Sequence, residues 1–135
     1  MTLRERQNQF IADLEIFDSW ADRFNYLISL SEELPAEFPE YLLPYRIEGC
    51  QSKTCFLPRI HDGLLYITGW SNSAVTGGII VAMTTIFNFT SKDEFQATDI
   101  DFHIRSGLLD NLTPMRRSAL EEMIRRISVL YPEKR

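Results

Sequence analysis

The residue best suited to chemistry in this 135-residue sequence is Cys50. Gly49 directly precedes it, and a residue without a Cβ atom lets the backbone turn sharply and leaves the thiol reachable. Gln51 and Ser52 follow, so Cys50 does not lie in an apolar run. Because a thiolate forms only where water or hydrogen-bond donors stabilise it, this polar setting favours a reactive thiol at Cys50.

The other cysteine, Cys55, has a different setting. It stands beside Phe56 and Leu57 at the start of a β-rich run, where a free cysteine usually behaves as a small hydrophobic residue. We favour a buried, structural Cys55. The alternative is that Cys55 faces Cys50, since the short loop between them can bring their Cα atoms within disulfide reach, and acts as a resolving or redox thiol.

Other kinds of reactive site find little support in the sequence. Cys50, Cys55, His61 and His103 are residue types that bind zinc, but their spacing is loose and lacks a C-x-x-C pair, so we expect no metal site. We interpret His61 as a turn residue and His103 as a surface or satisfied core residue. No histidine close to Cys50 in sequence supplies a protease-like base, and phosphate-binding and dinucleotide-binding loops are absent.

Length and composition fit one globular domain, which we assign to residues 1–135. The net charge of −5 argues against a nucleic-acid partner, because neutralising phosphates requires clustered Lys and Arg. No apolar run approaches the roughly 20 residues of a membrane span, so we expect no membrane association. The first residues lack the apolar core of a secretory signal, so we expect a cytoplasmic protein with reduced thiols.

Charge is distributed unevenly along the chain. Residues 1–49 carry ten acidic residues against four arginines, whereas the segment from Thr113 onward carries six basic residues against three acidic ones. Two interpretations stay open: the solvated faces of two helices, or a bipolar docking surface for a partner.

Two amphipathic helices are predicted before the cysteines. The first runs from Leu3 to about Glu15, and the second follows an N-cap at Asp18 or Ser19. The apolar stripes of the two helices contain Phe10, Leu14 and Phe17, and Trp20, Phe24, Leu27 and Ile28. Three prolines within residues 34–44 should then prevent regular helix and strand, so we expect a connector that leads to Cys50.

A β-hairpin is predicted after the cysteine loop. Residues 54–60 and 64–70 are apolar and β-rich, and the Asp62-Gly63 step between them is a strong hairpin signal. Pro58 cannot donate a hydrogen bond to a neighbouring strand, so the first strand should expose that side as an edge.

The next segment predicts the central buried helix, residues 74–87, with its N-cap within residues 71–73. It is apolar almost all round. Gly77 and Gly78 lower its intrinsic helix stability by roughly 1 kcal/mol each relative to alanine, which indicates close packing against another backbone. The functional alternative is that the cysteine loop lies over these glycines.

The last third of the chain predicts further helices. Residues 91–94 have the capping-box pattern, residues 101–106 fit a short helix stopped by Gly107, and Thr113-Pro114 fits the start of a long helix. The inner face of that long helix contains Met115, Ala119, Leu120, Met123, Ile124 and Ile127. The order of elements predicts the α+β class, with a small antiparallel sheet packed against several helices.

Four separated motifs resemble motifs of the SufE family of sulfur-acceptor proteins and occur in the same order as in that family. These motifs are Gly49-Cys50-Gln51-Ser52, Phe17-Asp18-Ser19-Trp20, Tyr26-Leu27-Ile28 and Leu112-Thr113-Pro114-Met115-Arg116. The resemblance extends from about Ile11 to Ile127. It implies a SufE/IscU-like α+β fold, related to iron–sulfur scaffold proteins.

The resemblance also implies a function. In that family the cysteine of the G-C-Q-S loop accepts a persulfide sulfur from a cysteine desulfurase that carries pyridoxal phosphate, and the sulfur goes to iron–sulfur cluster assembly. Cys50 matches that cysteine, with Gly49, Gln51 and Ser52 around it, and Arg116 matches the arginine of the T-P-x-R motif. The expected partners are a desulfurase and a downstream iron–sulfur scaffold, a homodimer is possible, and no cofactor is expected on this chain. We expect no autonomous turnover.

Three positions depart from the family pattern. The family usually has a tryptophan where Cys55 stands, an aspartate where Asn72 falls and a basic residue near Gly77. These positions bear on partner choice and on the fate of the sulfur. Two other functions are therefore considered: a regulatory module that binds a desulfurase without carrying sulfur, and a Cys50/Cys55 thiol redox protein.

Overall fold

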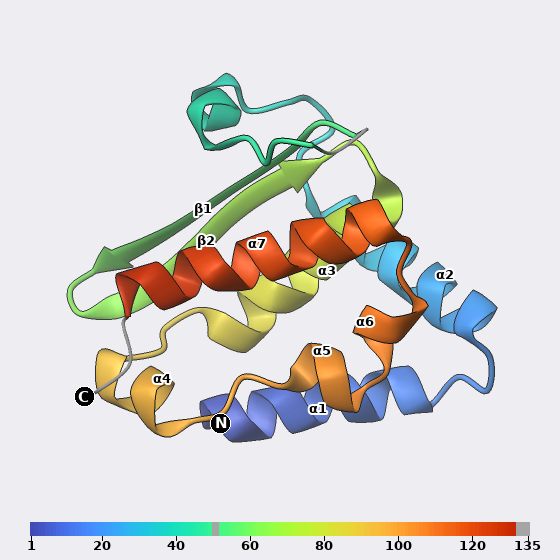
Figure 1. Ribbon diagram of the computed structural model, residues 1–135, viewed down its shortest axis with the longest axis horizontal. Coiled ribbons are helices and arrows are strands. Elements are labelled where there is room, and N and C mark those ends of the chain that lie inside the picture. The colour runs from blue at the N-terminus through green and yellow to red at the C-terminus, as the bar shows by residue number, and fades with distance from the viewer. Residues whose placement is uncertain (50–51, 132–135) are drawn as a thin grey trace.

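The computed structural model describes residues 1–49 and 52–131 and confirms the predicted α+β class (Figure 1). A two-stranded antiparallel sheet packs with several helices. In chain order, the elements are α1 (Leu3–Glu15), α2 (Trp20–Leu30), the 3-10 helices η1 (Ser31–Glu33) and η2 (Glu40–Tyr45), β1 (Thr54–His61), β2 (Leu64–Ser71), α3 (Ala74–Phe87), α4 (Lys92–Ala97), α5 (Phe102–Arg105), α6 (Leu108–Asn111) and α7 (Pro114–Leu130).

Helix α3 is the buried centre of the molecule, as its apolar sequence predicts. It contacts α1, α2 and β2, and most of its side chains are buried. At Gly78 a Cβ atom would lie 1.8 Å from the Leu27 carbonyl oxygen, so α2 and α3 approach backbone to backbone. Among the described residues, the atoms nearest to a Cβ at Gly77 belong to Leu34, Ser31 and Ser71, and the alternative that the cysteine loop covers the glycines stays a prediction, because the centre of that loop lies outside the described residues.

The predicted hairpin is confirmed. Asp62 and Gly63 have φ values of 51° and 76°, which is the left-handed pair that a two-residue type I′ turn requires. In this register Phe56 lies opposite Gly69 and Pro58 opposite Ile67, so these side chains share the core face. Helix α3 packs against β2 and α7 against β1.

The outer edge of β1 agrees with the expectation from Pro58. The carbonyls of Thr54 and Phe56 point away from β2, because they accept hydrogen bonds from the Ile47 backbone at 2.8 Å and from Arg126 at 2.8 Å. Strand alternation gives Pro58 the same outward direction, so its missing N–H falls on the unpaired edge.

Three local expectations need correction. Residues 40–45 form the 3-10 helix η2 despite Pro44, because a tight turn near its end tolerates the fixed φ of proline. Thr113 occupies the N-cap of α7, but its side chain makes no capping hydrogen bond. Ser91 caps α4, yet the predicted capping box is incomplete, because the Glu94 carboxylate accepts from the Leu3 backbone at 2.7 Å instead.

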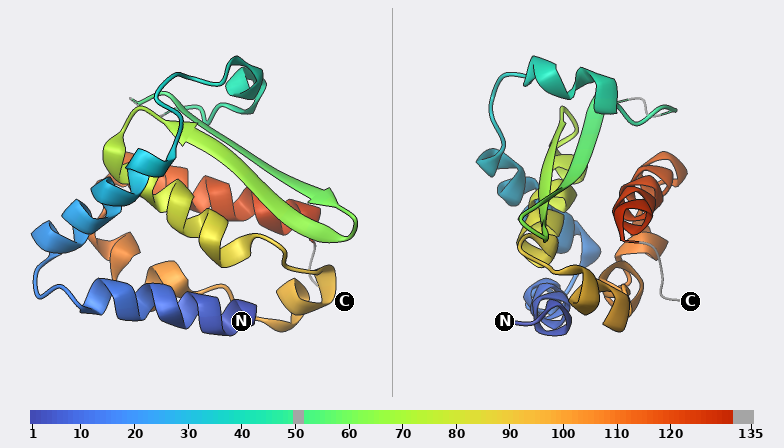
Figure 2. Two further views of the ribbon diagram at one scale, coloured as in Figure 1. Left: turned by 180° about the vertical axis from the view of Figure 1, so that it is seen from behind. Right: turned by 90° about the vertical axis from the view of Figure 1, so that its left-hand side faces the viewer.

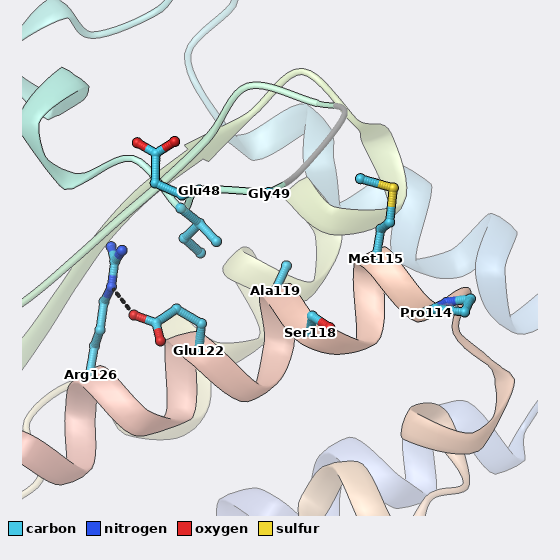
Figure 3. Close-up of a pocket in the computed structure, with 9 residues that line it drawn as sticks. Glu48, Gly49, Pro114, Met115, Ser118, Ala119, Glu122 and Arg126 are labelled. Atoms are coloured by element: carbon cyan, nitrogen blue, oxygen red, sulfur yellow. Dashed lines mark hydrogen bonds and ion pairs between the residues drawn. The ribbon is translucent and has the colours of Figure 1, made fainter.

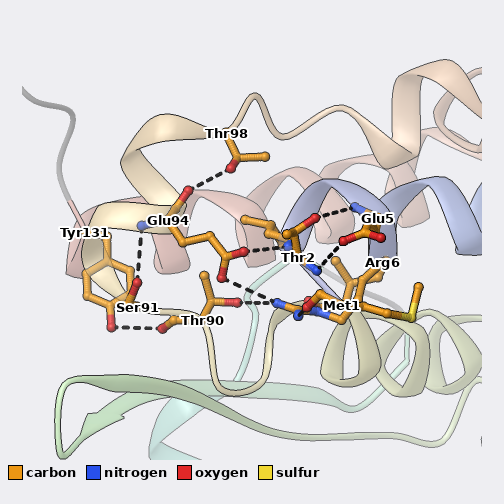
Figure 4. Close-up of polar contacts among 11 residues, drawn as sticks. Met1, Thr2, Glu5, Arg6, Thr90, Ser91, Glu94, Thr98 and Tyr131 are labelled. Carbon is orange, nitrogen blue, oxygen red and sulfur yellow. Dashed lines mark hydrogen bonds and ion pairs between the residues drawn. The ribbon is translucent and has the colours of Figure 1, made fainter.

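Glu94 therefore joins the start of α1 to α4 (Figure 4). Arg6 extends this cluster by donating to the Thr90 hydroxyl at 3.0 Å, and Tyr131 donates to the Thr90 carbonyl at 3.3 Å. The cluster holds the start of the chain, the segment before α4 and the residue after α7 together. None of the helices in residues 1–49 and 52–131 is long and apolar enough to cross a membrane.

Candidate functional site

Cys50 and Gln51, the centre of the predicted site, lie outside the described residues, so the site is built here from the chain on either side. The N-terminal arm is residues 45–49 and the C-terminal arm is residues 52–54. Gly49 has a φ of 82°, a left-handed conformation that glycine adopts without strain, in line with the turn expected before the cysteine.

Arg126 of α7 fixes the N-terminal arm. Its guanidinium donates to the carbonyls of Tyr45 at 2.7 Å, Arg46 at 3.1 Å and Phe56 at 2.8 Å. The first two carbonyls belong to the arm and the third to β1. One planar cation therefore joins the arm, the sheet edge and α7.

Glu122 orients Arg126 from one helical turn earlier. Its carboxylate accepts from Arg126 at 2.8 Å and from Arg125 at 2.7 Å. These contacts, with the hydrogen bond from Arg125 the largest cause, lower the pKa of Glu122 to about 2. The carboxylate is therefore ionised at neutral pH and holds the guanidinium in place.

Asn72 fixes the C-terminal arm. Its side-chain oxygen accepts from the Lys53 backbone at 3.0 Å, and its own backbone N–H donates to the Lys53 carbonyl at 3.1 Å. The Lys53 ammonium lies 3.6 Å from the centre of the Phe38 ring, which packs edge-on against Trp70. Asn72 stands where the family pattern has an aspartate, and an aspartate oxygen could accept the same hydrogen bond from the Lys53 backbone.

A chain of hydroxyl groups continues from the same arm into the fold. Ser52 Oγ lies 3.0 Å from Thr54 Oγ1, which lies 2.8 Å from Ser71 Oγ. Ser71 Oγ also accepts from the Ser73 backbone N–H at 3.1 Å, and Ser73 is the N-cap of α3. The arm is thereby connected to the start of the central helix.

Two cavities open beside the ends of these arms. One, of about 610 Å³, includes Glu48, Gly49, Ser118, Glu122 and Arg126 in its lining (Figure 3). The other, of about 420 Å³, is lined by Ser52, Ser73, Thr76, Thr113, Pro114, Met115, Arg116 and Ala119. We call them the Gly49 cavity and the Ser52 cavity. They share Pro114, Met115 and Ala119, so the first turns of α7 form the floor of both.

Arg116 differs from the other arginines of α7. Arg125 and Arg126 pair with Glu122, and Arg117 lies 3.8 Å from the Asp110 carboxylate. Arg116 is exposed, lines the Ser52 cavity and makes no hydrogen bond or ion pair with the residues that the structure describes. Much of the basic charge of the C-terminal segment is thus used internally, which weakens the interpretation of a broad basic docking face.

Cys55 pairs with Trp70 of β2, and its side chain lies on the other face of the sheet from that of Phe56. Helix η2 contacts the strand β1, to which Cys55 belongs. It is fully buried. Burial raises the pKa of its thiol, and the charges of Lys53, Arg46 and Arg126 oppose that rise. A buried thiol with a raised pKa has little thiolate, which makes a resolving role harder to fulfil.

Neither histidine lines the two cavities beside the arms. His61 is exposed at the hairpin and lies 3.3 Å from Asp62. His103 is buried, which lowers its pKa, but its Nδ1 has no partner among the described residues, so the expected satisfied core histidine is only half correct. Within residues 1–49 and 52–131, no cluster of three or more His, Cys, Asp or Glu side chains could hold a metal.

Sequence reasoning missed Arg126, Glu122 and the hydroxyl chain. The Glu122–Arg126 spacing of four residues is a recognisable helical ion pair, but nothing local shows that Arg126 also reaches a carbonyl 81 residues away. Thr54 and Ser71 give a weaker signal, because polar residues at strand ends are common.

Comparisons with known proteins agree with these features. Residues 8–130 match the SufE family model, described as the Fe-S metabolism associated domain. An uncharacterised SufE-like protein of Rhizobium meliloti (strain 1021) is 31% identical over 127 residues, covering 89% of this chain and 90% of that protein. Another, from Rhizobium etli, is 25% identical over 126 residues, covering 89% of this chain and 85% of that protein.

A solved structure shows a similar fold. The solution structure of a hypothetical protein from Thermus thermophilus matches with a TM-score of 0.67 and 15% sequence identity. The match covers 92% of this chain and 94% of that one.

Proposed function

Because this chain belongs to the SufE family, whose domain is associated with Fe–S metabolism, we propose that Cys50 accepts sulfur from a cysteine desulfurase. The sulfur then passes to iron–sulfur cluster assembly. The partner desulfurase carries the pyridoxal phosphate, and this chain contributes a thiol and a docking surface. A downstream iron–sulfur scaffold is the proposed acceptor.

The proposed reaction is a thiol exchange. The Cys50 thiolate attacks the outer sulfur of the desulfurase persulfide and forms a new S–S bond. The old S–S bond breaks, and its electron pair leaves with the donor cysteine as a thiolate. Cys50 then holds the sulfur as a persulfide, and no oxidant or reductant is consumed.

The observation that best supports Cys50 as the acceptor is the contrast between the two cysteines. Cys55 is fully buried in the sheet. Gly49 and Ser52, on either side of Cys50 and Gln51, line open cavities, and the arms behind them are fixed by Arg126 and Asn72. A loop with fixed ends can be presented to a partner without reorganising the fold.

Intact-mass measurement after incubation with a cysteine desulfurase and free cysteine tests the proposal. We expect the wild-type chain to gain the mass of one sulfur atom and to lose it again with reductant. The Cys55→Ala variant should gain it as well, whereas Cys50→Ser should not.

Two outcomes would count against sulfur transfer through Cys50. If Cys50→Ser stimulated the desulfurase as fully as the wild type, the chain would be a regulator and not a carrier. If mild oxidant removed both free thiols in one step, a Cys50/Cys55 redox function would replace the proposal.

A further inference from the structure

A third cavity lies between α1, α2 and α3, and we call it the Tyr26 groove. Its volume is about 180 Å³, and it shares no lining residue with the Gly49 cavity or the Ser52 cavity. In the left view of Figure 2 the three helices that form it are turned toward the viewer, and α7 lies behind α3. The groove is therefore a separate site from the cysteine loop and its arms.

The floor of the Tyr26 groove is apolar. Helices α1 and α2 both pack on α3 but contact each other much less, which leaves a strip of core side chains between them. This floor consists of Phe10, Leu30, Val81, Ala82 and Ile86. Leu30 is partly buried and the other four are buried. An alkyl chain on this floor would leave water without burying a polar group, which is favourable.

Three oxygen-bearing side chains stand beside this floor: the carboxylates of Asp13 and Glu33 and the hydroxyl of Tyr26. Asp13 accepts from the Gln9 amide at 2.8 Å and has no ion pair among the described residues. The Glu33 carboxylate and the Tyr26 hydroxyl make no hydrogen bond or ion pair with those residues. Burial raises the pKa of Tyr26 most, and the charges of Asp13 and Glu33 raise it further. Both carboxylates thus act on one hydroxyl, so this end of the groove is electronegative.

Arg6 also lines the groove, but it does not neutralise the acidic end. Seven residues of α1 separate it from Asp13, which is about 10 Å along the helix axis. Its guanidinium donates to the carbonyls of Ile86, at 2.6 Å, and of Met1. It also lies 3.9 Å from the Glu94 carboxylate. These contacts hold Arg6 at the far end of the groove, so the acidic end can accept another cation.

The charge of the surrounding chain has the same sign. Residues 1–49 carry ten acidic residues against four arginines. Three of these arginines, Arg4, Arg6 and Arg23, are occupied by ion pairs or backbone carbonyls within the fold. Much of the acidic charge of this part of the surface is therefore unbalanced, and a partner that binds there must bring positive charge.

We propose that the Tyr26 groove receives a lysine side chain of a partner protein. The alkyl stem lies on the apolar floor, and the ammonium group donates to Asp13, Glu33 and Tyr26. An ammonium has three donors in different directions, which suits acceptors on three elements, α1, α2 and η1, whereas the planar fork of arginine suits a single carboxylate. Small-molecule sites usually exceed roughly 300 Å³, so a groove of about 180 Å³ fits one side chain better than a cofactor.

Backbone-amide NMR of the whole chain, titrated with a lysine residue blocked at both ends, tests the inference. The probe is Nα-acetyl-lysine N-methylamide, and it is compared with the norleucine and arginine counterparts. Norleucine keeps a straight alkyl stem and lacks the ammonium group. We expect the lysine probe to shift the amides of the residues that line the Tyr26 groove. It should bind at least about threefold more tightly than the norleucine probe, because one exposed ion pair contributes up to about fivefold and two carboxylates are present.

Neutral variants of the two carboxylates locate the ammonium group. Asp13→Asn and Glu33→Gln should each raise the Kd of the lysine probe about two- to fivefold and leave that of the norleucine probe unchanged. Glu32→Gln is the matched control, since Glu32 is exposed and precedes Glu33 but does not line the groove. We expect it to bind the lysine probe as the wild type does. Added salt should weaken the lysine probe and not the norleucine probe.

Several results would overturn the inference. Absent binding, or equal Kd values for the lysine and norleucine probes, would show that the groove recognises no cation. An equal effect of Glu32→Gln and Glu33→Gln would reduce the attraction to general surface charge. Tighter binding of the arginine probe, or of free n-butylammonium, would assign the groove to a different occupant. Sulfur transfer through Cys50 does not depend on any of these results, because the intact-mass experiment tests it separately.

Discussion

Arg126 shows how a single side chain can position a loop to which it does not belong. Its guanidinium contacts carbonyls of the N-terminal arm and of β1, and Glu122 holds it from the same helix. A lysine could not make these contacts together, because its ammonium is a point donor and lacks the planar fork. The arginine thus acts as a fixed part of the scaffold.

Replacing Arg126 with methionine should lower the free energy of unfolding by about 1–3 kcal/mol, because the Phe56 carbonyl loses its donor in a partly buried position. Urea denaturation measures this. The control is Arg125→Met, which removes an exposed contact to the same Glu122 and should change the free energy of unfolding much less than Arg126→Met does. Equal losses in the two variants would show that the carbonyl contacts contribute little.

Glu122 predicts a pH dependence of stability. Its pKa in the folded protein is about 2, below the usual value of 4.5, so folding favours the ionised form. The resulting stabilisation is fully present above pH 4.5 and is lost as the pH falls toward 2. In Glu122→Gln, unfolding measured between these pH values should show a shallower dependence than in the wild type. Parallel curves would mean that other carboxylates account for the acid sensitivity.

At the scale of elements, the approach of α2 to α3 depends on Gly78. A Cβ atom there would meet the Leu27 carbonyl at 1.8 Å, a contact that neither backbone can relieve by a rotamer change. At Gly77 the nearest atom is a Leu34 methyl group at 3.1 Å, which belongs to a flexible side chain. The two neighbouring glycines therefore differ in how much they constrain the packing.

We expect Gly78→Ala to lower the free energy of unfolding by more than about 3 kcal/mol, because the two helices must separate. Gly77→Ala should be close to neutral, since the gain of about 1 kcal/mol in helix propensity offsets the tight contact. Thermal denaturation followed by circular dichroism compares them. A stable Gly78→Ala protein would show that α2 can shift at little cost.

Elements with strong local signals could be predicted from the sequence. The bounds of α1 and α3 follow from apolar periodicity and capping residues, and the hairpin follows from Asp62-Gly63. Helix η2, which contacts β1, could not be predicted in this way, because its prolines suggest irregular structure. The predicted capping box is incomplete, because the Glu94 carboxylate accepts a hydrogen bond from the distant Leu3 backbone and not from the backbone of the N-cap residue Ser91.

At the scale of the whole molecule, the family resemblance and the observed fold agree. The site is harder to predict, because contacts between distant segments create it: Arg126 reaches residues 70 to 81 positions earlier. Sequence motifs predict Cys50 and Arg116 as site residues, but they do not indicate which side chains fix the arms or how charge differs between the two cavities. Those properties depend on how α7 packs beside β1, as both views in Figure 2 illustrate.

Sulfur transfer and stability should therefore depend on different residues of α7. Arg116 lies on the exposed side of its first turn at the Ser52 cavity, whereas Met123 is fully buried two turns later. Arg116→Gln should slow sulfur transfer from a desulfurase while changing the free energy of unfolding by less than about 0.5 kcal/mol, as surface substitutions usually do. Met123→Ala should open a cavity costing about 2–5 kcal/mol, yet keep near wild-type transfer where it remains folded. Single-turnover sulfur loading and urea denaturation of both variants measure the two effects. If Arg116→Gln lost stability and sulfur transfer in proportion, the role of Arg116 would be structural, and its match to the arginine of the T-P-x-R motif would not indicate a part in sulfur transfer.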